Sequence, residues 1–83
     1  MISVKATYDE DNKKIILELT HNDKTEVIEA SVRSSGMFRF SYHHPELDKP
    51  DQYHGLFLSG NKFIIYPILG KGVISDKPIT IEQ

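Results

Sequence analysis

The sequence predicts an all-β protein, either a small antiparallel barrel or a two-layer sandwich of about six to seven short strands. Most segments alternate apolar and polar residues with a period of two, which is the pattern of half-buried strands. Clusters of turn-forming residues interrupt the chain every eight to twelve residues or so, as in small sandwiches and barrels. The 83 residues suffice for a single β-rich domain, residues 1–83, with a modest core.

Composition narrows the classes of function. The chain has 10 basic and 12 acidic residues and a net charge of −2, with the two signs interspersed. Nucleic-acid binders usually carry a basic stripe, so no nucleic-acid partner is expected. No apolar run reaches the roughly 18 residues of a membrane span, and the first residues do not resemble a signal peptide. We therefore expect a cytoplasmic protein with no membrane partner, and without cysteine it has no disulfide or thiolate site.

The first strands are predicted from a clear alternation. Residues 2–8 alternate apolar and polar side chains, and residues 15–19 repeat the pattern after a segment rich in turn formers, 9–13. These two strands are predicted to pair as an antiparallel hairpin. A further turn is expected at residues 21–24.

Segment 25–33 admits two interpretations. As a helix it would begin at an Asp23 cap, with Glu26 three residues later, and would end at Gly36. Its β-branched residues favour a strand instead, and its apolar positions scatter around a helical wheel. We expect a strand, and an α+β fold with one helix near 24–34 is the alternative.

The strands on either side of residues 60–61 are predicted to form the central hairpin. Glycine followed by asparagine fits a two-residue turn, because glycine accepts a positive φ at the first position. Such a turn would set Leu58 opposite Phe63 and Leu56 opposite Ile65.

The remaining elements are shorter. Residues 37–42 alternate in a way that gives one strand an aromatic face. Pro67 cannot donate to a β-ladder and predicts an edge, a bulge or a bend. Residues 70–72 are predicted to form a tight turn, 75–78 to interrupt the last strand, and 79–81 to complete it.

The stretch FSYHHPELDKPDQYHG, residues 40–55, is the strongest candidate for a binding surface. Its middle, 44–52, is the longest predicted connection, and long loops on a compact scaffold are enriched in function. Pro45 and Pro50 reduce the freedom of the unfolded chain, which lowers the ordering cost of binding. Tyrosine and arginine are frequent at binding hot spots. The residues predicted to contact a protein partner are Arg39, Tyr42, His44, Glu46, Asp48, Lys49, Asp51, Tyr53 and His54.

The same stretch also has the residue types of a metal or catalytic site. It holds three histidines and three carboxylates, which are ligand types for zinc and other divalent ions. Neighbouring His43 and His44 point to opposite faces of an extended chain, and Pro45 keeps His44 extended. We therefore expect no metal and no cofactor. No serine lies in a nucleophile-elbow sequence and no carboxylate pair stands out, so no catalytic residue and no enzymatic activity are predicted.

These features lead us to expect a small stand-alone protein-binding module. A stoichiometric inhibitor or an immunity-type protein of bacterial or phage origin matches the size and composition, and it would act through the 43–54 loop. One alternative is a β-barrel that binds a small ligand or a metal with the loop histidines. Another is a structural subunit of a homo-oligomer. An open edge at the first or last strand could also pair with a partner or a second copy.

Overall fold

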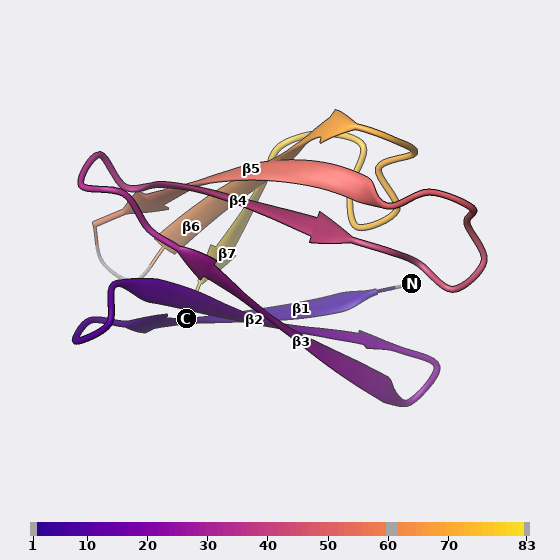
Figure 1. Cartoon of the computed structure of the whole chain (residues 1–83), viewed down its shortest axis with the longest axis horizontal. Coiled ribbons are helices and arrows are strands. Elements are labelled where there is room, and N and C mark those ends of the chain that lie inside the picture. Colours follow the sequence, from indigo (N-terminus) through magenta and orange to yellow (C-terminus); the bar gives the residue numbers. More distant parts are fainter. Residues whose placement is uncertain (1, 60–61, 83) are drawn as a thin grey trace.

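The protein is a sandwich of two antiparallel sheets (Figure 1). The computed structural model describes residues 2–59 and 62–82, and within these residues it contains seven strands and no helix. The all-β prediction is therefore confirmed. Nothing in the described ranges is a helix long and apolar enough to span a membrane. Sheet A consists of β1 (Ser3–Asp9), β2 (Lys14–His21) and β3 (Lys24–Ser31), and sheet B of β4 (Met37–Tyr42), β5 (Asp51–Leu58), β6 (Lys62–Leu69) and β7 (Ile79–Glu82).

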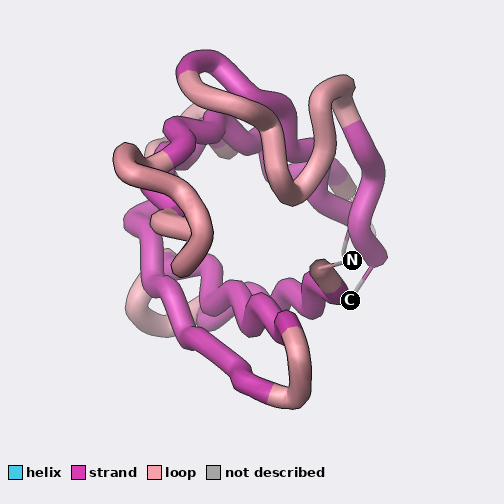
Figure 2. Tube along the Cα trace, turned by 90° about the vertical axis from the view of Figure 1, so that its right-hand side faces the viewer, coloured by secondary structure: helices cyan, strands magenta, loops and turns pink. Residues whose placement is uncertain are grey.

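The strands follow an up-and-down order. In both sheets each strand is hydrogen-bonded to the strand next to it in the sequence, and no crossover occurs within the described residues. At the two sides of the sandwich, β3 approaches β4 and β1 approaches β7. The trace accordingly surrounds the core almost as a ring (Figure 2), which is a form between the predicted sandwich and the predicted barrel.

The core lies between the two sheets because alternate side chains of each strand point inward. Ile15, Leu17 and Leu19 of β2 are at most 1% exposed, which confirms the alternation predicted for this strand. Tyr8 of β1 contacts Phe57 of β5 with ring centroids 4.5 Å apart, so this aromatic pair joins the two sheets.

The turn between β2 and β3 settles the identity of segment 25–33. Asn22 and Asp23 have φ values of 50° and 63°, which are the left-handed values of a two-residue hairpin turn. The chain reverses there, and β3 pairs antiparallel with β2 along its whole length. The segment is thus mostly strand, and the alternative of a helix near 24–34 is wrong.

Sheet B has an aromatic inner face, as predicted for residues 37–42. Phe40 of β4 lies opposite Tyr53 of β5, and the two rings stack with centroids 5.1 Å apart. Phe38 lies opposite Gly55, and its ring fills the space that a Cβ atom on Gly55 would occupy. Gly55 is therefore a packing requirement of the β4–β5 pair.

The predicted register of the β5–β6 hairpin is wrong by one residue. Leu58 lies opposite Lys62, and Leu56 lies opposite Ile64. The predicted turn at residues 60–61 lies outside the described residues. The observed register pairs Phe57 with Phe63 on the inner face, where their rings stack at 5.1 Å. Burial of these aromatic rings outweighs the preference for a two-residue turn.

The connections differ from prediction in one respect. The connection predicted at 44–52 was expected to be the longest. It spans 43–50, between β4 and β5, and the β6–β7 connection, 70–78, is longer. The last strand does not resume after the glycine turn at 70–72 and begins only at Ile79. The reason is a set of hydrogen bonds that draws the 71–74 segment onto β5, described below.

Candidate functional site

The 43–50 loop is held in one conformation by hydrogen bonds of its own. The His43 Nε2 atom lies 2.8 Å from the carbonyl oxygen of Leu47, and since that oxygen only accepts, the ring nitrogen donates. The Leu47 amide donates to the carbonyl of His44 at 3.0 Å. The Glu46 amide donates to His44 Nδ1 at 3.1 Å. These bonds close a compact turn at the start of the loop.

His44 supports this turn from beneath. Its side chain is buried, whereas that of His43 is exposed, which confirms that the two neighbours point to opposite sides. The His44 ring contacts His21 at a centroid distance of 4.6 Å and Tyr42 at 6.3 Å, in both cases edge to face. His44 is therefore placed as a packing residue below the exposed part of the loop.

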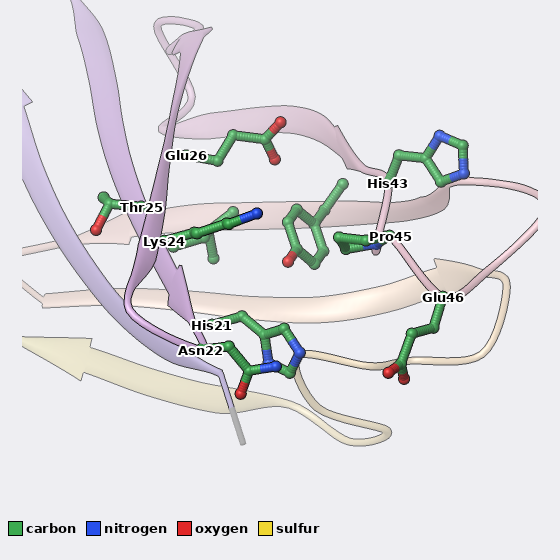
Figure 3. Close-up of a pocket in the computed structure, with 10 residues that line it drawn as sticks. His21, Asn22, Lys24, Thr25, Glu26, His43, Pro45 and Glu46 are labelled. Carbon is green, nitrogen blue, oxygen red and sulfur yellow. The ribbon is translucent and has the colours of Figure 1, made fainter.

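A hollow of about 290 Å³ separates the loop from the β2–β3 hairpin (Figure 3). Glu26 and Lys24 extend over it from β3, and Pro45 and Glu46 line it from the loop. Tyr42 forms part of its apolar wall. The pKa of Tyr42 is raised, first by burial of the hydroxyl and second by the charge of Glu26. The hollow thus has apolar walls and a charged rim.

A second hollow, of about 350 Å³, lies on the other flank of the loop. Its walls are residues 46–51 and the first residues of the β6–β7 connection, Gly70 and Lys71. The exposed residues of the loop consequently stand between two concave surfaces. Concave surfaces beside a protruding loop are suited to receiving side chains of a partner.

Asp51 holds the base of this second hollow. Its carboxylate is 1% exposed and accepts backbone N–H bonds from Lys71 at 2.7 Å and Val73 at 2.8 Å. The Tyr53 hydroxyl donates to it at 2.9 Å and accepts from the Ile74 amide at 3.0 Å. One carboxylate and one hydroxyl therefore fasten the 71–74 segment to β5.

These contacts determine the titration of both groups. Burial alone raises the pKa of Asp51, but the hydrogen bonds from Val73, Lys71 and Tyr53 outweigh it, and the pKa is lowered from its ordinary value of 3.8. Burial raises the pKa of Tyr53, with a further increase from Asp51. Asp51 is thus a charged group that its neighbours stabilise, and Tyr53 is a neutral donor.

The nine residues predicted to contact a partner occupy three environments. Glu46, Asp48 and Lys49 are exposed on the 43–50 loop. Arg39 and His54 lie opposite each other on the outer face of sheet B, where His54 Nδ1 is 3.3 Å from the Tyr66 hydroxyl. The inward-pointing members of the set are buried: Tyr42, His44, Asp51 and Tyr53.

The histidines do not converge. His43 is exposed, His44 is buried and His54 belongs to the outer face of sheet B. Among residues 2–59 and 62–82, no three His, Asp or Glu side chains are grouped so that they could hold a metal ion. The histidine that does lie beside His44 is His21, which the sequence reasoning missed. The predicted up-and-down strand order could have placed His21 near His44, because the turns after the second and fourth strands lie at the same end of such a fold.

This end of the molecule presents charged and apolar groups side by side on its surface. Exposed carboxylates, an ammonium group and two prolines are presented by the loop, next to apolar hollows. No protein-family model, no curated protein and no solved structure matches the chain.

Proposed function

We propose that the protein is a stand-alone binding module that contacts a protein partner through the 43–50 loop and the two hollows beside it. The observation that carries this proposal is the internal bonding of an exposed loop: His43 to Leu47, Leu47 to His44 and Glu46 to His44. A loop already fixed in one conformation loses little entropy on binding, so more of its contact energy becomes affinity.

The composition of the loop suits a protein surface. Glu46, Asp48 and Lys49 supply charges of both signs at positions reached by solvent, and such groups set orientation and specificity. Pro45 and Glu46 border one hollow, and Pro50 borders the other. A stoichiometric inhibitor or an immunity-type protein would act with this surface by covering a functional region of its partner.

The loop is tested by a triple substitution, Glu46→Ala, Asp48→Ala and Lys49→Ala. The charge-matched control is Lys5→Ala, Glu10→Ala and Asp11→Ala, which changes exposed residues of β1 and of the β1–β2 turn. Both proteins are used as bait in a quantitative pull-down from cells of the source organism. We expect the loop variant to lose a partner that the control retains at about one-to-one stoichiometry, with affinity reduced at least tenfold.

Thermal melts of both variants complete the experiment, because a folded loop variant is required. Buried members of the predicted set, such as Tyr53, are left unchanged, since their removal would disturb the fold. Equal capture of the same partner by the two variants would exclude the loop as the contact surface.

A further inference from the structure

One strand edge is open on the surface of the molecule. β3 is hydrogen-bonded to β2 alone among the described strands, so its other edge has no strand partner. Figure 1 shows β3 and β4 diverging from the corner between them toward the β2–β3 turn. Residues 24–27, at the diverging end, are all exposed. This edge therefore offers backbone N–H and C=O groups to another chain.

The turn geometry decides which residues face the open edge. A two-residue turn makes His21 and Lys24 the first hydrogen-bonded pair, and in an antiparallel ladder such pairs recur at every second residue. The Val32 amide continues this series by donating to the Lys13 carbonyl at 2.9 Å. Even-numbered residues of β3 thus face β2, and Thr25, Val27 and Glu29 direct their backbone groups outward.

Val27 is the centre of this set. Its side chain is 60% exposed and belongs to the outer face of sheet A together with those of Thr25 and Glu29. An exposed β-branched residue in the middle of an unpaired edge favours the addition of a further strand.

Among the described edge strands, β1, β3, β4 and β7, only β3 has four consecutive exposed residues. β1 and β7, the outermost strands at one side of the sandwich, approach each other, and β4 is approached by β3. Lys5 lies on β1 and Pro78 immediately precedes β7, so these two predicted edges lie near one another, whereas the exposed residues 24–27 lie on the diverging half of β3. An interface in which the same edge of both copies pairs about a two-fold axis closes on itself, so it produces a dimer and not a filament.

We propose that two copies of the chain associate through β3, antiparallel, about a two-fold axis at Val27. Outward-facing residues pair with outward-facing residues, so Val27 lies opposite Val27 of the second copy and Thr25 opposite Glu29 of the second copy. The hydroxyl of Thr25, which is 3.0 Å from that of Thr20 within its own copy, then lies beside the Glu29 carboxylate and can accept from Thr20 while it donates to Glu29. The two A sheets become one six-stranded sheet. This interface includes Thr25, which also lines the first hollow, so it borders the surface proposed for the protein partner but uses none of the exposed residues of the 43–50 loop.

A cysteine placed on the proposed axis tests the register directly, because the natural chain has none. Val27→Cys would face itself at a Cα separation of about 5.5 Å, within the range a disulfide requires. The control is Glu18→Cys, which lies beside Val27 on β2 but about three strand spacings from its counterpart, roughly 14 Å.

Under mild oxidation we expect Val27→Cys to form a dimer of twice 9.5 kDa and Glu18→Cys to remain monomeric. Equal cross-linking of the two variants, or none by Val27→Cys, would overturn the proposal.

Proline substitutions test the backbone bonds without a new covalent link. Val27→Pro removes an outward N–H that the β2–β3 ladder does not use, so the domain stays folded while association weakens at least tenfold. Ser34→Pro is the control, since Ser34 is the second residue of the turn closed by the Gly36 amide and the Arg33 carbonyl, a position that accepts proline.

Sedimentation velocity up to about 1 mM measures the association, which a one-strand interface should keep weak. We expect unsubstituted protein and Ser34→Pro to dimerise and Val27→Pro to sediment as a monomer. An unsubstituted protein that is monomeric throughout, or a Val27→Pro dimer, contradicts the inference. The loop triple variant should dimerise normally, so this result and the partner assay can fail independently.

Discussion

A single buried carboxylate organises the end of the molecule that carries the candidate site. Asp51 is the first residue after the 43–50 loop, and its hydrogen bonds to Lys71 and Val73 fix the start of the β6–β7 connection. A buried charge without partners would be strongly destabilising. Here the donors are supplied by backbone N–H groups and by Tyr53, so the charge defines the position of a segment that has no regular secondary structure.

Asp51→Asn tests the role of this charge. The amide retains the size of the carboxylate but not its charge or its capacity to accept every bond, so we expect a loss of about 2–3 kcal/mol in the free energy of unfolding. Urea unfolding, monitored by circular dichroism, measures this change in the free energy of unfolding. The control Asp48→Asn changes an exposed carboxylate and should alter the same quantity by no more than about 0.5 kcal/mol. Similar values for the two variants would contradict the assigned role.

Residue roles at the site were only partly predictable from the sequence. Alternation counted back from Phe57 places Gly55, Tyr53 and Asp51 on one face, so the inward direction of Asp51 was present in the pattern. The hydrogen-bond partners of Asp51 could not be predicted from the pattern, because Lys71 and Val73 are about twenty residues away in an irregular segment. A polar residue beside a loop is easily predicted to contact a partner when the hydrogen-bond donors that hold it inside the fold are not known.

The packing of one strand against its neighbour can require a particular residue at a single position. The β4–β5 pair depends on the close approach of the Phe38 ring to Gly55. A methyl group there must displace an aromatic ring that is 2% exposed and has no free volume to enter.

Gly55→Ala is therefore expected to lower the free energy of unfolding by about 1–3 kcal/mol, or the melting temperature by about 5–20 °C. Thermal unfolding measures the change. The double variant Gly55→Ala with Phe38→Leu should recover part of the loss, because the smaller side chain vacates the space that the methyl group needs. Simple additivity of the two single effects would show that the ring and the glycine do not interact as described.

Elements with clean alternation were predicted well, and elements decided by tertiary packing were not. The first two strands and the aromatic strand followed directly from their period of two. Segment 25–33 was ambiguous because the first half of β3, Lys24–Val27, is exposed on both faces and shows no apolar period. The β5–β6 register was missed because apolar residues occupy both faces of that hairpin, so only the ring pair of Phe57 and Phe63 decides between the two alignments.

The stability of the whole domain should depend on pH in a specific way. The pKa of Asp51 in the folded protein is lowered from 3.8, so the folded state favours the ionised form more than the unfolded state does. The corresponding stabilisation is complete above that value and is lost as the pH falls below it. The exposed Asp9, whose pKa is lowered by hydrogen bonds from the Asn12 side chain and backbone, titrates in the same direction.

Thermal melts between pH 7 and pH 2 check this dependence. The melting temperature should fall as the pH drops below 3.8, and the difference between the unsubstituted protein and Asp51→Asn should be largest at neutral pH and should narrow in acid. Asp9→Asn provides the comparison for an exposed carboxylate. A difference that stays constant from pH 7 to pH 2 would mean that the charge of Asp51 contributes nothing.

The up-and-down strand order also shapes how the chain reaches its native state. Because every hydrogen-bonded pair among the described strands is adjacent in sequence, each pair forms without closing a long loop. During synthesis the whole of sheet A, which ends at Ser31, leaves the ribosome before sheet B is available to cover Ile15, Leu17 and Leu19. The nascent chain then passes through a stage in which an apolar face and an open strand edge are exposed together, and this is the stage at which a chaperone would engage it.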